Sequence, residues 1–398
     1  MRFGVSRDWQ RNRSALRVPE VKFDECPVCK NAEGIPSLNE TTQAPARWYI
    51  GTPNTMKFKL KLFPRGRREW LWMLFQLILF FLLFTAARLY MISMPGHSHT
   101  GPLQPLSDDE AALRDRLRAH VSTIAGKIGE RNLKHYEALQ SAADYVRSSF
   151  KQFGYEVAEQ EFSVDGKIVR NLEVRIDGTG RVDESVVVGA HYDSVYGSPG
   201  ANDNATGVAA LLELARSFKE QTPARTVRFV AFVNEEPPYF QTDNMGSRVY
   251  ARRCRDHREN VTTMLSIETI GCYSDAEDSQ IYPFPFKLFY PTRGNFVGFV
   301  GNTSSRSLVR KAIGSFRQNA AFPSEGIAAP GGLTGIGWSD QWSFWEEGYP
   351  GVMITDTAIF RYKHYHKLAD TPDKTDYDGM SRVVAGLARV LAGLGTDE

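Results

Sequence analysis

The longest run of apolar residues lies between Trp70 and Ala87, where only Gln76 and Thr85 interrupt a series of Leu, Phe, Ile, Met, Ala and Trp. As an α-helix, a run of this length reaches across the hydrocarbon core of a lipid bilayer. The helix would be apolar on all sides, which favours a membrane span over a core helix of a soluble domain. The pattern therefore predicts a transmembrane helix within residues 69–94, in contact with the lipid bilayer.

The charges on the two sides of this run differ. Basic residues crowd the side that precedes it, whereas the side that follows has Arg88 and then no Lys or Arg before Arg114. The basic flank consists of Lys57, Lys59, Lys61, Arg65, Arg67 and Arg68. Because basic flanks stay in the cytoplasm, we expect a cytoplasmic amino terminus and a periplasmic, extracellular or lumenal location for everything after residue 94. A cleaved signal peptide is the rival interpretation, which the long segment before the apolar run disfavours.

The segment before the predicted helix also differs from the rest of the chain in charge. Residues 1–68 contain 14 Lys and Arg against 6 Asp and Glu, while the remainder contains 34 against 40. The basic excess therefore belongs to this tail, and we expect no nucleic-acid partner for the globular part. Since residues 1–55 show no sustained hydrophobic period, we expect the tail to be poorly ordered.

Cys26 and Cys29 lie in this tail with the spacing of a zinc knuckle. A second pair of ligands is missing from the same stretch, so a four-ligand structural zinc site cannot be completed there. We interpret the two residues as reduced thiols, with a shared metal or redox role in an oligomer as the alternative.

After a linker at residues 95–107, helical and strand patterns alternate. Ser107 and Glu110 have the spacing of a capping box and predict the start of a helix. Two alternating segments joined by Asp165-Gly166 predict a β-hairpin. Afterwards, short β-branched runs alternate with helical segments, one of which is predicted over Asn204–Lys219. This alternation is typical of a parallel sheet covered on both faces. We expect residues 108–398 to form one α/β domain, a three-layer sandwich with a largely parallel mixed central sheet.

Two cysteines of this domain, Cys254 and Cys272, are predicted to be free thiols. The first lies near the carboxyl end of a helix and the second just past the end of the following strand. A strand of about six residues separates these levels by roughly 20 Å. Disulfide geometry does not reach this far.

Candidate metal ligands follow three successive predicted strands. These residues are His191 and Asp193 after the first strand, Glu235 and Glu236 after the second, and Glu268 after the third. Because the carboxyl ends of parallel strands meet at one edge of the sheet, we expect the side chains to lie close together. Asp203, from a loop rich in Gly and Asn, and one histidine of His364-Tyr365-His366 add further ligands of the kind that zinc prefers.

At these positions the chain resembles the co-catalytic zinc aminopeptidase family. The resemblance rests on the segments GAHYDS, NDNATG, NEEPP, MGSRVYA, SIETIG and YHKLADTPDK, which stand in the family's order and spacing. The family, grouped as metallopeptidase clan MH, includes aminopeptidase Y-like and leucyl aminopeptidases, glutamate carboxypeptidase and the glutaminyl cyclases. The resemblance covers about residues 108–398 and leaves the tail and the apolar helix unexplained.

The resemblance implies a set of metal ligands. His191 and Glu268 would hold one zinc ion, Glu236 and His366 would hold the other, and Asp203 would bridge the two. The family's ligand at the position of Glu268 is commonly Asp, so the longer side chain leaves a weaker site or a single-metal state as the alternative to two zinc ions per chain.

Other residues receive supporting roles from the same resemblance. Asp193 would accept a hydrogen bond from the imidazole of His191 and fix its tautomer. Glu235 would be the general base, taking a proton from metal-bound water and later giving it to the leaving amine. Glu235 and Glu236 can differ in role only if the strand has already turned into a loop, which Pro237-Pro238 encourages.

Three assignments near the carboxyl end stay open. The Asp-Thr-Pro run after His366 favours this residue over His364 as a ligand. Tyr365 is a candidate for stabilising the oxyanion, with a packing role as the alternative. Asp340, in Trp338-Ser339-Asp340-Gln341, resembles an active-site acid of the cyclase branch by position alone and receives no role.

The implied function is that of a membrane-tethered zinc exopeptidase of the aminopeptidase type, which hydrolyses peptides outside the cytoplasm by a metal-bound hydroxide. A glutaminyl cyclase-like acyltransferase is the first alternative. A non-catalytic scaffold is the second, which the presence of Glu235 and all five ligand positions disfavours. The preferred substrate side chain depends on loops such as 284–295 and 321–337, and neither this preference nor the oligomeric state follows from the sequence.

Overall fold

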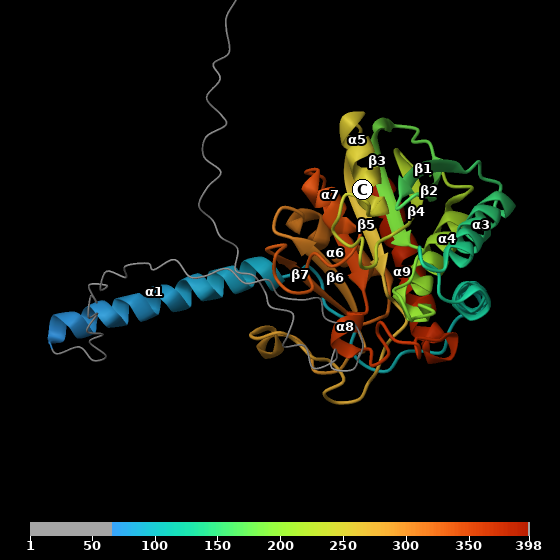
Figure 1. Ribbon diagram of the computed structural model, residues 1–398. Helices are drawn as coiled ribbons and strands as arrows, with labels where there is room; N and C mark the ends of the chain where they lie inside the picture. The colour runs from blue at the N-terminus through green and yellow to red at the C-terminus, as the bar shows by residue number, and fades with distance from the viewer. Residues whose placement is uncertain (1–65, 397–398) are drawn as a thin grey trace, which may run out of the picture. The chain divides into compact units, whose positions relative to one another are not determined.

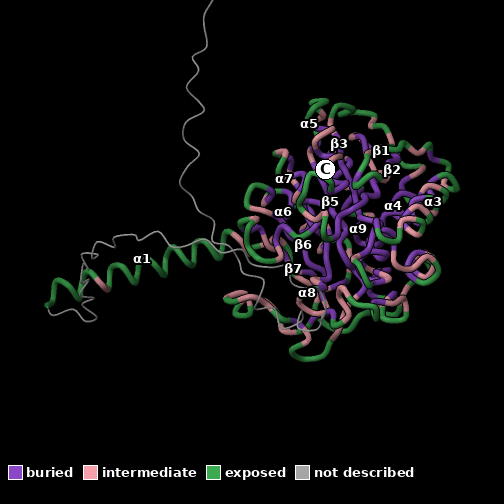
Figure 2. The backbone as a smooth tube through the Cα atoms, viewed as in Figure 1, coloured by how far each residue is buried: buried purple, intermediate pink, exposed green. Residues whose placement is uncertain are grey.

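The computed structural model describes residues 66–396 of the 398-residue chain. The predicted disordered tail, most of its basic flank and the pair Cys26 and Cys29 lie outside the described residues. The first described element is helix α1, Arg67–Ile92, and none of its residues is buried (Figures 1 and 2). Among the described residues it is the one helix long and apolar enough to cross a membrane.

A single mixed sheet forms the centre of the domain, with the strand order β1-β2-β4-β3-β5-β8-β6-β7. Strands β4, β3, β5 and β8 run parallel to one another, as do β6 and β7, while β1 with β2, β2 with β4 and β6 with β8 pair antiparallel. The largely parallel mixed sheet predicted from the sequence is therefore confirmed. The strands are β1 (Ala158–Val164), β2 (Lys167–Ile176), β3 (Arg181–His191), β4 (Arg225–Phe232), β5 (Asn260–Glu268), β6 (Val297–Asn302), β7 (Ser324–Ala329) and β8 (Gly351–Thr355).

Helices cover both faces of this sheet, as expected for an α/β sandwich (Figure 1). The first face carries α2 (Asp108–Val121), α3 (Tyr136–Gln152), α4 (Thr206–Phe218), α6 (Arg306–Asn319) and α9 (Tyr377–Gly395). The opposite face carries α5 (Gly246–Asp256) and α7 (Gln341–Glu346). A further short helix, α8 (Ala358–Arg361), follows β8. The predicted three-layer α/β architecture is confirmed.

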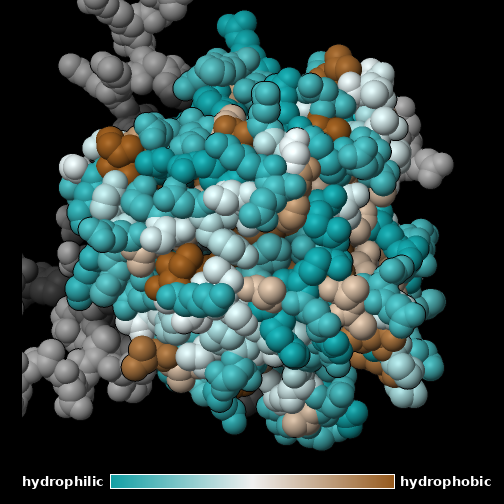
Figure 3. All heavy atoms as spheres, turned by 90° about the vertical axis from the view of Figure 1, so that its right-hand side faces the viewer, coloured by the Kyte–Doolittle hydropathy of each residue, from teal (hydrophilic) through white to brown (hydrophobic). Residues whose placement is uncertain are grey.

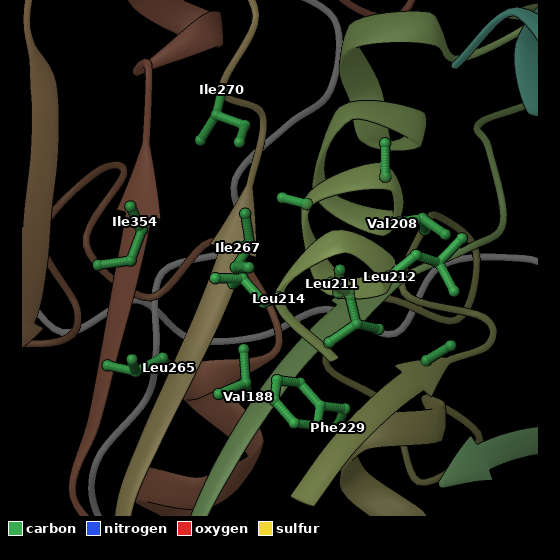
Figure 4. Close-up of a cluster of buried hydrophobic side chains, with 14 of the residues drawn as sticks. Val188, Val208, Leu211, Leu212, Leu214, Phe229, Leu265, Ile267, Ile270 and Ile354 are labelled. Carbon is green, nitrogen blue, oxygen red and sulfur yellow. The ribbon is translucent and has the colours of Figure 1, made fainter. Parts of the chain in front are cut away.

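Strand β3 illustrates why the central strands have continuous apolar runs. Val186 and Val188 pack into the core beneath the larger helical layer, while Val187 between them packs against the opposite layer. Figure 4 shows the first of these cores, which contains Val188 of β3 together with Val208 and Leu211 of α4. A strand buried on both faces has no solvated side and therefore loses the apolar–polar alternation of an exposed strand.

Local signals read from the sequence recur in the structure. The Ser107 hydroxyl accepts a hydrogen bond from the Glu110 amide at 3.3 Å, and the Glu110 carboxylate accepts one from the Ser107 amide at 2.9 Å. Asp165 and Gly166 have φ of 49° and 75°, and such left-handed turn residues match the twist of a two-residue hairpin. Cys254 and Cys272 are free, as predicted.

Three elements differ from the sequence-based expectation. Helix α4 begins at Thr206 rather than Asn204, because the Asn204 side chain turns back and accepts a hydrogen bond from the Gly207 amide at 3.0 Å. The residues before it, Ala201–Ala205, form a separate turn, η3, in which Asp203 and Asn204 have non-helical backbone angles. The segment 321–337, read as a loop, contains the edge strand β7, and its neighbour β6 was not predicted either.

Candidate metal centre

The predicted ligands come together where three neighbouring strands end. In the sheet, β3 lies between β4 and β5, and all three run in the same direction. His191 is the last residue of β3 and Glu268 the last residue of β5, and Nε2 of His191 lies 3.2 Å from Oε2 of Glu268. The convergence expected for the carboxyl edge of a parallel sheet is thus present.

Two clusters of three side chains share one aspartate. In the first, Nε2 of His191 lies 3.3 Å from Oδ1 of Asp203, and Glu268 completes the group. In the second, Nε2 of His366 lies 3.1 Å from Oδ2 of Asp203 and 3.2 Å from Oε2 of Glu236. The two carboxylate oxygens of Asp203 therefore belong to different clusters, and the five residues are those expected as ligands.

The donor atoms of these clusters suit a metal ion. Both ring nitrogens of His191, Nε2 of His366 and Oδ1 of Asp203 are buried and have no hydrogen-bond partner among residues 66–396. Unpaired buried polar atoms are costly unless something else satisfies them. Imidazole nitrogens and carboxylate oxygens are also the donors that zinc takes in proteins. The residues present therefore fit zinc.

Asp203 is held in place through the backbone around it. The carboxylate of Asp370 accepts hydrogen bonds from the amides of Asn202 at 2.8 Å and Asp203 at 3.1 Å. Below this turn lies the fully buried Arg131, whose guanidinium donates to the carbonyl oxygens of Gly200 at 2.9 Å, Tyr192 at 2.6 Å and two further residues. Arg131 and Asp370 thus fix the turn that carries Asp203.

Replacing Arg131 should cost much of the domain's stability. Arg131→Met would remove the guanidinium donors of four carbonyl groups and leave four nearby carboxylates without a buried counter-charge, which costs about 3–5 kcal/mol. We expect a clear fall in the midpoint of thermal unfolding. The exposed Arg293, which pairs with Glu277, is the matched control, and Arg293→Met should leave the midpoint unchanged. Equal midpoints for both variants would contradict the structural role of Arg131.

The carboxylate of Asp193 organises the loop that carries the two glutamates. Its oxygens accept hydrogen bonds from the amides of Glu235 at 3.1 Å and Glu236 at 3.2 Å. Oδ1 of Asp193 lies 3.5 Å from Nδ1 of His191, which is longer than a normal hydrogen bond. Strand β4 ends at Phe232, so both glutamates follow the strand in a loop, as expected, and their side chains can point in independent directions.

Three residues of the centre have left-handed backbone conformations. The φ angles are 59° at Asn234, 49° at Thr269 and 56° at His366. Asn234 directly precedes Glu235, and Thr269 directly follows Glu268. Such conformations cost free energy in residues other than glycine and persist where the surroundings enforce them, most often at functional sites.

Burial and crowding shift the acidity of these groups. Burial raises the pKa of Glu235 well above its ordinary value, and the neighbouring carboxylates of Glu268 and Glu236 raise it further. Burial, together with the charge of Asp203, raises the pKa of Glu236 to about 7. Burial lowers the pKa of His366, but its hydrogen bonds and charge interactions with Asp203 and Glu236 outweigh this effect and raise the pKa to about 10. A cation held among these carboxylates would relieve the repulsion that raises their pKa values.

The remaining candidates lie around the clusters. The hydroxyl of Ser339 donates a hydrogen bond to Oε2 of Glu268 at 2.7 Å. A residue outside the clusters thus holds this glutamate, whose side chain is longer than the aspartate common in the family. The ring of Tyr365 stacks on His366 with centroids 3.9 Å apart. His364 packs edge-on against Tyr362 and belongs to neither cluster. Asp340 is fully buried, and burial raises its pKa to about 7.

An apolar cavity of about 120 Å³ adjoins the clusters, and Glu268 and Tyr365 line it. It lies over β8, β6 and β7, on the side of the sheet that carries α5 and α7. Its walls come from those strands and from the segments 280–290, 334–338 and 357–360. Apolar lining residues include Val300, Ile327, Met353, Phe286, Phe360 and Trp338.

Comparison with known proteins assigns the chain to a family. Residues 171–391, more than half of the chain, match the model of peptidase family M28. The chain belongs to peptidase family M28. The family predicted from the sequence is therefore confirmed, and so is the prediction of a zinc peptidase at the level of the family.

Relatives of this M28 peptidase support the assignment over most of the domain. An Escherichia coli K12 protein described as the uncharacterized protein YfbL is 34% identical over 287 residues, which cover 70% of this chain and 87% of the relative. A probable zinc metalloprotease of Pyricularia oryzae is 25% identical over 336 residues, which cover 70% of this chain and 64% of the relative. The chain thus spans less than two thirds of the fungal protein.

Solved structures share the fold of the M28 peptidase. A zinc aminopeptidase from Bacillus subtilis matches with a TM-score of 0.58 and 14% identity, covering 72% of this chain and 95% of the other. A glutaminyl cyclase from Fimbriiglobus ruber matches with a TM-score of 0.53 and 20% identity, covering 74% of this chain and 97% of the other. At these identities the likeness concerns the fold, and one fold hosts both named activities.

Two residues that support the metal centre were not recognised from the sequence. Asp370 lies within the segment YHKLADTPDK, so its place in the motif was visible although its contact with the turn of Asp203 was not. Arg131 stands alone, far from every motif, and only the structure brings it beneath residues 199–203. An isolated arginine carries no spacing signal that distinguishes it from the chain's many surface cations.

Proposed function

We propose that this M28 peptidase is an aminopeptidase with two zinc ions per chain. The observation that carries the proposal is Asp203, whose two oxygens face His191 and His366 at 3.3 and 3.1 Å. A carboxylate shared in this way suits two adjacent cations, with His191 and Glu268 on one side and Glu236 and His366 on the other. When bound, the ions supply the Lewis acidity that polarises the scissile carbonyl and activates water.

Glu235 is the proposed general base. Its carboxylate lies 3.9 Å from Nε2 of His191 and outside both ligand clusters, so it is close to the reacting centre but free of the ligand set. Burial raises its pKa well above the ordinary value, which is the direction that makes a carboxylate a stronger base. Glu235 would take a proton from the attacking water and deliver it to the amine that leaves.

Other residues of the chain position this machinery. Asp193 fixes the loop of Glu235 and Glu236 through their amides, and its Oδ1 lies near Nδ1 of His191, at 3.5 Å. Tyr365, which lines the cavity and stacks on His366, is placed to donate a hydrogen bond to the developing oxyanion. The apolar cavity beside Glu268 would accept the side chain of the substrate's first residue, which favours a large apolar side chain over a charged one.

A glutaminyl cyclase-like acyl transfer is the second candidate. It is favoured by Asp340, a fully buried acid whose two oxygens have no hydrogen-bond partner in the described part of the chain. Such an acid near Glu268 and His191 could pass a proton during cyclisation of an amino-terminal glutamine. This reaction would release ammonia and leave every peptide bond intact.

A substrate panel with and without a chelator tests these functions. We expect chelator-sensitive release of the first residue from peptides that begin with Leu or Phe, restored by added zinc, and at least tenfold less turnover of peptides that begin with Asp. Ammonia release from Gln-peptides without cleavage would establish the cyclase instead. Carboxyl-terminal cleavage would overturn the aminopeptidase assignment, and the absence of any chelator-sensitive turnover would leave a non-catalytic scaffold.

The proposal also includes the membrane topology of the chain. Residues 69–94 would cross the bilayer once, with residues 1–68 on the cytoplasmic side as a basic tail. Residues 95–107 would link the span to a peptidase domain, residues 108–398, on the periplasmic, extracellular or lumenal side. The apolar character of α1 and its lack of buried residues support the span, and the positive-inside rule supports the orientation.

A further inference from the structure

A loop beside the cavity, residues 281–289, exposes three large apolar side chains. Ile281, Phe284 and Leu288 are 67%, 88% and 69% exposed, and Phe284 has the largest exposed fraction among the large apolar residues that the structure describes. By contrast, the face of the domain shown in Figure 3 is mostly hydrophilic, with its apolar residues scattered. An apolar cluster on a soluble surface marks a site of contact with a partner or a membrane.

The loop has two distinct sides, and hydrogen bonds hold its base in place. Tyr282 and Phe286 face inward and line the cavity, while Ile281, Phe284 and Leu288 lie outside the lining. The base of the loop is tied down, because the Ile281 amide donates to the Phe360 carbonyl at 2.9 Å and the Tyr282 hydroxyl donates to the Pro291 carbonyl at 2.8 Å. The outward apolar side chains are therefore presented by a fixed loop.

The end of this loop packs against the apolar helix α1. The ring centroids of Phe289 and Phe84 lie 6.1 Å apart, and the guanidinium of Arg88 lies over the Phe289 ring at 4.6 Å. The carboxyl end of α1 also contacts the domain, because Arg306 donates to the Tyr90 carbonyl at 2.6 Å and Met91 packs against the cluster around Val300. These contacts fix the level of the loop along α1.

That level lies within the apolar part of the helix. Trp72 and Tyr90 stand 18 positions apart in α1, which corresponds to about 27 Å, close to the thickness of a bilayer's hydrocarbon core. Trp and Tyr concentrate at the two membrane interfaces, so Tyr90 marks the interface on the side of the domain. Phe84 stands six positions before Tyr90, about 9 Å deeper. Phe289, which touches Phe84, therefore lies below the interface.

We propose that the loop 281–289 inserts Ile281, Phe284 and Leu288 into the bilayer that α1 crosses, as a second membrane contact of the domain. Interfacial elements bury their apolar side about 5–10 Å deep, which agrees with the level of Phe84. Glu277 and Asp278 come just before the loop, and Asp278 pairs with Lys287 of the loop at 3.8 Å. These charged side chains are exposed and stay in water, so they limit the depth of the loop. The inference rests on the proposed membrane span and adds that the wall of the substrate cavity lies at the lipid surface.

A depth measurement on the full chain in liposomes tests the loop. In a background with Cys26, Cys29 and Cys272 replaced by serine, Phe284→Cys carries an environment-sensitive fluorophore. We expect a blue-shifted emission, protection from aqueous iodide, and quenching by lipids with a nitroxide high on the acyl chain. Val182→Cys, at a site 65% exposed on β3, is the aqueous control, and Leu82→Cys, 63% exposed on α1, is the membrane control.

Each outcome decides the proposal. If the probe at 284 behaves like the probe at 182 while the probe at 82 is quenched by lipid, the loop stays in water and only the span survives. If the probe at 82 also behaves like the probe at 182, the span itself fails and the inference fails with it. Protection from iodide without quenching by lipid would show that a second copy of the chain covers the loop, which also overturns the proposal.

A charge variant adds an independent check. Leu288→Glu should raise the iodide quenching of the probe at 284 at least twofold, because a carboxylate is expelled from the acyl region. Turnover of a small soluble substrate should stay within twofold of the parent, since neither Phe284 nor Leu288 lines the cavity. Unchanged quenching in a variant that retains turnover would contradict insertion.

Discussion

Glu235→Gln protein should retain the zinc content of the wild type and hydrolyse peptides about 10²- to 10⁴-fold more slowly. The amide has nearly the same size as the carboxylate but cannot accept a proton from water, so proton transfer is lost while the site keeps its shape. Glu235 belongs to neither ligand cluster, and its backbone amide is held by Asp193, so the substitution leaves the metal positions intact. Steady-state kinetics and elemental analysis of the same preparation measure both effects.

The adjacent residue provides a matched control. Glu236→Gln makes the same chemical change one position further along the loop, but Oε2 of Glu236 lies 3.2 Å from Nε2 of His366, inside the second cluster. We expect this variant to lose zinc as well as activity, and excess zinc to restore part of both. If Glu235→Gln loses zinc and Glu236→Gln does not, the roles of the two glutamates are reversed.

Much of the fold was predictable because its signals are local or periodic. The capping box at Ser107, the turn at Asp165-Gly166 and the β-branched run before His191 each specify their element from a few residues, and the structure contains all three. Strand β7 was missed since its sequence, Ser-Glu-Gly-Ile-Ala-Ala, has small residues and one charge. It pairs with β6 over six residues, so tertiary pairing rather than side-chain propensity makes it a strand.

The candidate site was predictable to a similar extent. Ligand types at the ends of three parallel strands indicated which residues would meet, because the topology of such a sheet brings these ends together. The sequence did not reveal the supports behind them, such as the contacts of Arg131 with the backbone of residues 199–200. These contacts join segments about 70 residues apart through main-chain carbonyls, which every residue possesses, so no residue pattern encodes them.

The cavity and its loop were the least predictable parts. Their shape depends on how the segment 280–290 lies over β6 and β7, and neither of these strands was recognised from the sequence. The exposure of Phe284 has the same origin, because an isolated Phe in a Pro-rich stretch is normally expected to pack inward. Packing between distant segments therefore determines both the specificity of the cavity and the proposed membrane contact.

The sharpest test of the dinuclear centre compares substitutions at Asp203 and His191. Asp203→Asn should lower the affinity for both zinc ions, because its two oxygens face different clusters, whereas His191→Ala should weaken one site only. In a zinc buffer that saturates the wild type with about two ions per chain, we expect about one ion in His191→Ala and fewer in Asp203→Asn. Both variants should lose at least about 10²-fold in turnover.

The test requires zinc content and activity to be measured on the same preparations. Wild-type protein that is fully active with one zinc per chain would exclude a two-ion mechanism and would indicate that Glu268, in place of the family's usual aspartate, leaves its site empty. If Asp203→Asn and His191→Ala each lose the same single ion, Asp203 is a ligand of one site and not a bridge. We expect the opposite result, in which Asp203→Asn weakens both sites, because Asp203 belongs to both clusters and its charge is lost from both at once.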